Sequence, residues 1–187
     1  MSHSTQYAET AETVIVVLAQ HRDLAAFHEL VRRFQGRLTY YVRRLIGKGS
    51  EADDVIQETW LIVHRRLATL AAPAAFRVWL FKIAHDSAVS HLRKVSRLPT
   101  PRSDDTEFSN AIEAWNEFEA MEYAELVHRT LESLSHEHRE VLTLRFLEQM
   151  EVAEIAQVVG SSIGTVKSRL HYAKSALRKK IEEEIHD

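Results

Sequence analysis

The chain has 187 residues, of which 45% are hydrophobic, enough to bury the core of one ordinary domain or two small ones. It contains no cysteine, which excludes disulfide frameworks and thiolate metal sites and favours a reducing compartment. The formal net charge is −3, and there are only five glycines and three prolines, so helix breakers are rare. We therefore expect an all-α protein. Its longest apolar run, at 14–19, is too short to span a bilayer, which favours a cytoplasmic protein without direct membrane insertion.

Four helices are expected in the first half of the chain. The first covers 8–20, and Asp23 is placed to cap the second. Ser50, followed by Asp53, resembles a capping box that opens the third helix. Pro73 suits the first turn of the fourth. Apolar residues recur at helical spacing through the last three of these helices: Leu24, Phe27, Leu30, Val31, Phe34, Leu38, Tyr41 and Leu45; Ile56, Trp60, Val63 and Leu67; Phe76, Trp79, Leu80, Ile83, Ala84, Ala88, Leu92 and Val95.

A change of composition separates the two halves. Residues 96–110 break the periodicity with two prolines, serines and acids, and 103–126 carries eight acidic residues and no Lys or Arg. A polar helix is expected over 111–134. We expect a domain over 1–95, a flexible acidic linker over 96–125 and a second small helical domain over 126–187.

The second domain is expected to end in three helices. Ser135 begins the first, with Val141, Leu142, Leu144 and Phe146 inside. A short helix with Val152, Ile155, Ala156 and Val159 follows and ends at Gly160. Ser162 is placed to cap the last helix. The apolar stripe of that helix is Val166, Leu170, Ala173, Leu177, Ile181 and Ile185.

Two short helices around a glycine-containing turn are the elements of a helix-turn-helix, whose second helix enters the major groove of DNA. Between 162 and 180 there are six Lys or Arg and no acidic residue, although the whole chain is acidic. The bland alternative is a basic solvated helix in a bundle. The candidate DNA-contacting residues combine small hydroxyl, cationic and aromatic side chains: Ser162, Thr165, Lys167, Ser168, Arg169, His171, Tyr172 and Lys174.

"LESLSHEHREVLTLRFLEQMEVAEIAQVVGSSIGTVKSRLHYAKSALRKKI" closely resembles region 4 of bacterial sigma-70 family sigma factors of the extracytoplasmic-function (ECF) group. "DLAAFHELVRRFQGRLTYYVRRLIG", "ADDVIQETWLIVHRRL" and "FRVWLFKIAHDSAVSHLRK" resemble their region 2, in the same order. The resemblance implies a protein that binds RNA polymerase core and directs promoter-specific initiation. It implies no enzymatic activity, no cofactor and no metal.

The resemblance also implies roles for particular residues. The helix from 163 on would read the promoter −35 element. "DDVIQETW" would dock on the coiled coil of the polymerase β′ subunit, and region 4 on the β flap. An anti-sigma factor is a further implied partner. The polymerase-binding residues would be Asp53, Asp54, Gln57, Glu58 and Trp60. The −10 element would be melted and bound by Arg77, Lys82, His85, Arg93 and Lys94.

The loop "ATLAAPAA", 68–75, departs from the family pattern. In the family this loop captures a flipped base and usually has polar or acidic residues, whereas here it is rich in alanine. Trp79 and Phe81, nearby, are interpreted as core residues rather than base-stacking ones.

Two other functions remain open at this point. A free-standing helix-turn-helix regulator would explain the last third of the chain but leaves "DDVIQETW" and the basic fourth helix without a role. A metal-dependent phosphohydrolase is suggested by the pair His85 and Asp86, but no second acidic ligand lies at a matching spacing.

Overall fold

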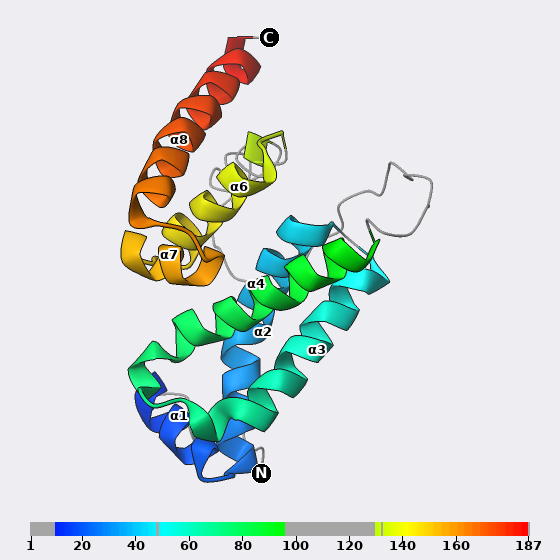
Figure 1. Cartoon of the computed structure of the whole chain (residues 1–187), viewed down its shortest axis with the longest axis vertical. Helices are drawn as coiled ribbons and strands as arrows, with labels where there is room; N and C mark the ends of the chain where they lie inside the picture. The colour runs from blue at the N-terminus through cyan, green and yellow to red at the C-terminus, as the bar shows by residue number, and fades with distance from the viewer. Residues whose placement is uncertain (1–9, 48, 96–129, 132, 187) are drawn as a thin grey trace. The chain divides into compact units, whose positions relative to one another are not determined.

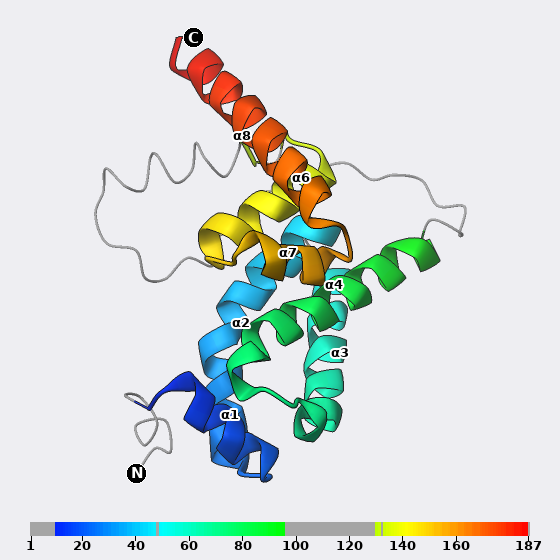
Figure 2. The same cartoon turned by 60° about the vertical axis from the view of Figure 1, so that its left-hand side comes forward.

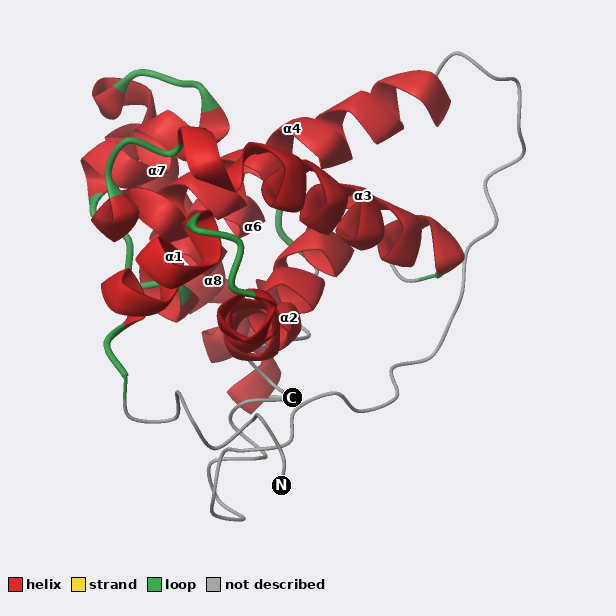
Figure 3. Cartoon of the chain, turned by 90° about the horizontal axis from the view of Figure 1, so that it is seen from below, coloured by secondary structure: helices red, strands yellow, loops and turns green. Residues whose placement is uncertain are grey.

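The computed structural model describes residues 10–47, 49–95, 130–131 and 133–186. Within those ranges the protein consists of helices and turns and contains no strand (Figure 3). The chain divides into two compact units, residues 1–100 and 101–187. The predicted all-α class with two small helical domains is confirmed. The predicted acidic linker, 96–125, and most of the helix predicted over 111–134 lie outside the described residues.

The first unit is built around a central helix. Its helices are α1 (Glu12–Gln20), α2 (Leu24–Ile46), α3 (Ser50–Arg66) and α4 (Phe76–Val95), as Figure 1 shows. Two short 3₁₀ turns, η2 (Leu67–Thr69) and η3 (Pro73–Ala75), join α3 to α4. Helix α2 packs against the other three helices, and α3 also packs against α4. The face of α2 that carries the predicted apolar stripe therefore becomes the centre of the core.

Aromatic contacts fix α4 against α2. Phe34 meets Phe76 edge to face with ring centroids 5.3 Å apart, and Tyr41 meets Phe81 at 5.1 Å. All four side chains are almost completely buried. Edge-to-face pairs of this kind add about 0.5–1.5 kcal/mol beyond the burial of their area. The interpretation of Phe81 as a core residue therefore holds.

Some sequence predictions for the first unit need correction. Asp23 does cap α2, because its Oδ1 accepts from the amide of Ala26 at 3.0 Å. The predicted capping box at Ser50 is wrong: α3 already begins at Ser50, and no side chain caps it. The preceding Gly49 has φ 139°, a left-handed conformation that favours glycine, and its carbonyl accepts the first bond of the helix. Some residues at the ends of the stripes lie outside the core and are exposed: Leu24, Leu92 and Val95.

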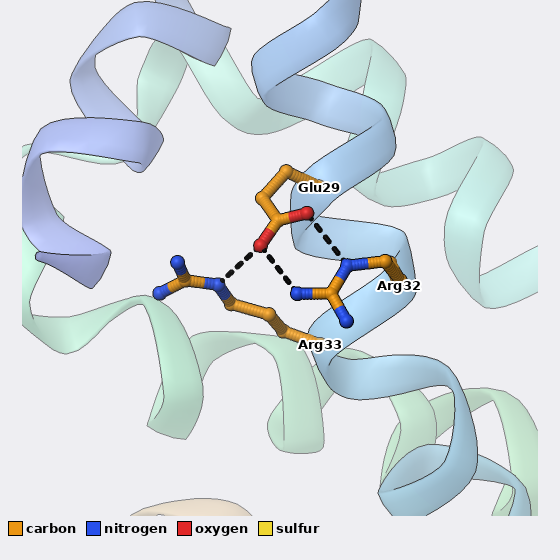
Figure 4. A network of polar contacts seen from close by, with 3 residues as sticks. All are labelled: Glu29, Arg32 and Arg33. Carbon is orange, nitrogen blue, oxygen red and sulfur yellow. Dashed lines mark hydrogen bonds and ion pairs between the residues drawn. The ribbon is translucent and has the colours of Figure 1, made fainter. Parts of the chain in front are cut away.

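An ion cluster around the buried carboxylate of Glu29 lies on the second turn of α2 (Figure 4). The Glu29 carboxylate, whose side chain is 3% exposed, accepts from Nε and Nη2 of Arg32 and from Nε of Arg33, each at 2.7 Å. The hydrogen bonds from Arg32, together with the one from Arg33, outweigh desolvation and lower the pKa of Glu29 to about 2. The ionised form of Glu29 is therefore stabilised by folding.

The second unit is a smaller bundle dominated by its last helix. It contains α6 (His136–Leu142), the π-helical turn η4 (Thr143–Leu147), α7 (Val152–Val159) and α8 (Ile163–His186), seen from another side in Figure 2. Helix α8 packs against both α6 and α7. Ser135, predicted to begin this helix, is its N-cap and accepts from His138 N at 3.4 Å. The buried residues of α8 that face these neighbours are Val166, Leu170 and Ala173.

The position of Phe146 in the second unit differs from the sequence prediction. It was predicted inside the helix, but it is 55% exposed, whereas Leu144 is completely buried. The cause is the π turn: the amide of Glu148 donates to the carbonyl of Thr143, five residues back, at 3.2 Å. The extra residue in this turn rotates Phe146 away from the register of the preceding helix. An aromatic ring is thereby presented at the surface.

Candidate functional site

The turn between α7 and α8 has the geometry of a helix-turn-helix. Gly160 ends α7 with a left-handed φ of 62°, and two serines separate it from α8. Ser162 Oγ accepts from the amide of Thr165 at 3.1 Å, so the predicted cap is confirmed. With Val166, Leu170 and Ala173 buried against α6 and α7, the opposite side of α8 is left to solvent. That outward side begins at the helix N-terminus, where backbone amides favour anions.

The small hydroxyl residues at the start of α8 bond mainly to each other and to the helix itself. The Ser162 and Thr165 hydroxyls lie 2.9 Å apart. Ser168 Oγ donates to the carbonyls of Gly164 and Thr165, at 3.2 and 3.0 Å. These bonds hold the three hydroxyl groups close to the helix backbone.

The cations of α8 lie on two flanks of that face. Lys167 and Lys174 are seven residues apart, about two turns, and so share one side. Arg169 lies about 200° around the helix from Lys167, on the other flank. Between the flanks the exposed rings of His171 and Tyr172 meet edge to face, with centroids 5.5 Å apart. The predicted residues thus form one face with cations at both edges and hydroxyls and rings in the middle.

On α3 the five predicted protein-binding residues divide into two groups. Asp53 and Trp60 point towards α2: Arg43 Nη2 lies 3.2 Å from Asp53 Oδ1, and Trp60 Nε1 donates to Gln35 Oε1 at 2.6 Å. The Trp60 ring also meets Phe27 of α2 edge on. These two residues therefore fasten α3 to α2, and Trp60 is half-buried.

The other three, Asp54, Gln57 and Glu58, are exposed on the outward side of α3. Leu61 lies among them, three residues after Glu58, four after Gln57 and seven after Asp54, and it is 62% exposed. Sequence reasoning missed Leu61, although one signal was available: it falls outside the apolar stripe formed by Ile56, Trp60, Val63 and Leu67. We call Asp54, Gln57, Glu58 and Leu61 the α3 face.

The five residues predicted on α4 to bind the −10 element do not share one face. Lys82 and Arg93, eleven residues apart, lie on nearly the same side, with His85 about 60° away. Lys82 Nζ is bonded to Asp86 Oδ1 at 2.7 Å. Arg77 lies towards the buried side of α4, and Lys94 lines a groove of about 260 Å³ between α3 and α4, together with Glu58 and Arg66. Trp79 is half-buried beside Phe76, which agrees with its interpretation as a core residue.

An apolar groove runs beside the C-terminal half of α8. Its volume is about 420 Å³, and Phe146 of η4 forms one wall. Leu177 and Ile181 were predicted to belong to the core stripe, but they are only half-buried and line this groove. Lys174, Arg178 and Glu182 frame it. The groove exists because the π turn moves Phe146 outwards.

Among the residues that the structure describes, no three His, Asp or Glu side chains are grouped so that they could hold a metal ion. No helix in these ranges is long and apolar enough to cross a membrane.

Two family models match the chain: sigma-70 region 2 over residues 30–98 and sigma-70 region 4 over residues 124–177. The RNA polymerase sigma-H factor of Pseudomonas aeruginosa is 34% identical over 179 residues, covering 90% of this chain and 92% of that protein. The ECF RNA polymerase sigma-E factor of Escherichia coli is 33% identical over 190 residues, covering 93% and 96%.

Two solved structures have a similar fold. CnrH, in complex with the cytosolic domain of CnrY, gives a TM-score of 0.64 at 24% identity, covering 92% of this chain and 97% of that one. The sigma factor RpoE of Bartonella quintana, in complex with the anti-sigma factor NepR, gives 0.69 at 21% identity, covering 83% and 96%.

Proposed function

The chain belongs to the ECF group of the sigma-70 family, non-enzymatic RNA polymerase sigma factors that direct promoter-specific transcription initiation, and from that premise we propose which surface carries each part of the task. Helix α8 reads the −35 element, α4 and the loop before it bind the melted −10 element, and the α3 face docks on the β′ coiled coil. The groove beside α8 receives the β flap.

The proposal for α8 depends on its outward face. A helix held by its neighbours through Val166 and Leu170 presents its N-terminal half as a unit, as major-groove recognition requires. Cations on the two flanks can reach the phosphate backbones that border a groove. Lys167, nearest the helix N-terminus, can also reach base edges, which would lie opposite Ser168, His171 and Tyr172. This arrangement, with hydroxyl groups and two exposed rings between two cationic edges, is the observation that carries the −35 proposal.

The α3 face has the composition of a protein-docking site. Leu61 supplies an exposed apolar centre, and Asp54, Gln57 and Glu58 supply a polar rim around it. Because Asp53 and Trp60 are bonded to α2, they support this face from the side rather than contributing most of its contacts. The two outward carboxylates would favour a partner with a basic docking surface.

For the −10 element, Lys82, Arg93 and the nearby His85 are the first candidates, because they lie on one side of α4 and can follow a strand backbone. Both side chains of the Lys82–Asp86 ion pair are exposed, so a DNA phosphate can replace Asp86 as the partner of Lys82 at a small cost in free energy. Arg77 and Lys94 lie on other sides of α4, and we assign them lesser roles.

The groove lined by Phe146, Leu177 and Ile181 suits an amphipathic helix with an apolar face. We propose the β flap as its occupant on the basis of the family. We also propose an anti-sigma factor as a regulatory partner, and the cytoplasm, where RNA polymerase works, as the place of action.

The experiment that tests these assignments compares core RNA polymerase with and without the protein on a library of promoter fragments. We expect specific transcripts and a promoter-specific gel shift only when core is present. A shift of equal affinity and specificity by the protein alone would instead favour a free-standing helix-turn-helix regulator, and the absence of any specific transcript would contradict the assignment of these surfaces.

A further inference from the structure

The side chain of Gln20, at the end of α1, reaches across to the loop that joins α3 to α4. Its Nε2 donates to the carbonyl of Leu67 at 3.1 Å and to that of Leu70 at 2.7 Å. An amide nitrogen has two hydrogens, and both are used in these bonds. The amide of Leu70 also donates to the carbonyl of Leu67, so η2 is closed by its own backbone and held from outside by Gln20.

Helix α1 supports the loop at both ends. It packs against η2, where the loop begins, and against η3 (Pro73–Ala75), where it runs into α4. Figures 1 and 2 both show α1 beside the chain segment that leads into α4. The loop is thus shaped by a helix that lies about 50 residues earlier in the sequence.

The loop has almost no polar side chain of its own. Residues 67–75 read "LATLAAPAA", in which Thr69 is the one polar residue. Its hydroxyl donates to the carbonyl of Arg66 at 2.7 Å, which keeps it within the turn. The exposed residues of the loop are otherwise alanines: Ala68, Ala71, Ala72, Ala74 and Ala75. The peptide groups of the loop are therefore the main polar contacts it can offer to a base.

We propose that Gln20 is a positioning residue for −10 recognition, which fixes the loop backbone so that its peptide groups, rather than its side chains, select the captured base. The inference depends on the assignment of this loop to the −10 element under the proposed function. Peptide groups cannot adjust by changing rotamer, and hydrogen bonds weaken steeply with misalignment, so selection by a backbone needs a backbone held in place. Gln20 supplies that restraint from a different helix.

The test uses holoenzyme assembled from core polymerase and the full chain, with promoters that carry each of the four bases at each −10 position. Opening is followed with a fluorescent base in the −10 element. Three variants change the Gln20 bonds in different ways. Gln20→Leu keeps the bulk and removes the donor, Gln20→Glu keeps the shape and turns an acceptor towards two carbonyls, and Gln20→Lys restores a donor. Thr13→Leu, on the exposed side of α1, is the matched control.

With Gln20→Leu we expect the preference for the best base at one −10 position to fall about three- to tenfold, the scale of one net hydrogen bond. Gln20→Glu should lower it at least as much, whereas Gln20→Lys and Thr13→Leu should stay within about twofold of wild type, a span of about 0.4 kcal/mol. Duplex binding at −35 and affinity for core should be unchanged in all four.

An equal loss of opening on every −10 variant, or unchanged base preference in Gln20→Leu, would overturn the positioning role. Failure of wild-type holoenzyme to open any promoter would instead contradict the proposed function itself, so the two failures are distinguishable.

Discussion

Lys174 of α8 lies with its Nζ 5.3 Å from the centre of the Phe146 ring on the π turn η4. A cation over an exposed ring contributes about 0.5–1 kcal/mol of stabilisation, which is enough to favour Lys174 rotamers that point towards Phe146. The ammonium of Lys167, two turns earlier on the same side, has no such neighbour among the contacts that the structure describes. The two lysines therefore have different surroundings although they share one flank.

This difference leads to a prediction for Lys167 and Lys174. Lys167, near the end of α8 that inserts deepest, is expected to contact bases, and Lys174 to contact the DNA backbone. Lys167→Ala should cost about 1–3 kcal/mol and relax one position of the −35 element, whereas Lys174→Ala should weaken all sequences alike and lower the salt slope by about one. Titration of duplexes with single-base −35 changes measures both effects. The same uniform loss in both variants would contradict base readout by Lys167.

The α3 face can be tested by charge reversal. Asp54→Arg combined with Glu58→Arg should weaken core binding, because it replaces two outward carboxylates by cations at the proposed docking surface. Both side chains are exposed, so neither change opens a cavity and the unfolding temperature should be nearly unchanged. Binding to labelled core is the measurement. The control is Glu51→Arg, which reverses a charge on the same helix but on the side that faces His91, away from the α3 face.

Leu61 provides an independent test of the same face. Leu61→Ser removes the exposed apolar centre, and we expect a loss of about 1–2 kcal/mol in core affinity. Because the side chain is 62% exposed, folding stability should change by less than about 0.5 kcal/mol. Leu92→Ser, an exposed leucine on α4, is the matched control. Full core affinity in the Leu61 variant would remove Leu61 from the proposed interface.

The Glu29 cluster predicts a dependence of stability on pH. Its carboxyl has a pKa of about 2 in the folded chain, below the ordinary value of 4.5, so the unfolded state binds more protons between these pH values. The contribution of Glu29 is therefore complete above about pH 4.5 and is lost as the pH falls towards 2. Glu29→Gln should lower the free energy of unfolding at pH 7 by about 1–2 kcal/mol, because the exposed Arg32 side chain leaves its ion pair with Glu29 partly screened by solvent.

The same substitution should also flatten the decline in stability between pH 4.5 and 2. Denaturant unfolding of wild type and variant at several pH values measures both effects, with Glu12→Gln as a control on α1. A constant difference between the two proteins across this pH range would show that ionisation of Glu29 is not the source of the stabilisation.

Local patterns in the sequence were enough to predict much of this protein. Helical periodicity identified the core residues of α2, and Asp23, Ser135, Ser162 and Gly160 marked helix ends, because caps and left-handed glycines act within a few residues of the chain. Motif spacing also indicated the family and the side of α8 proposed to face DNA, because the residues of each motif lie within two or three helical turns of one another.

Tertiary structure decided the features that depend on distant or irregular contacts. The π turn moved Phe146 from its predicted place in the core to the surface and opened the groove beside α8, because one extra residue in a turn changes the register of everything after it. Because α3 packs against α2, Asp53 and Trp60 form hydrogen bonds to side chains of α2, whereas Leu61 faces solvent. No local pattern could pair Gln20 with Leu70, because that bond exists only once α1 is folded beside a loop fifty residues away.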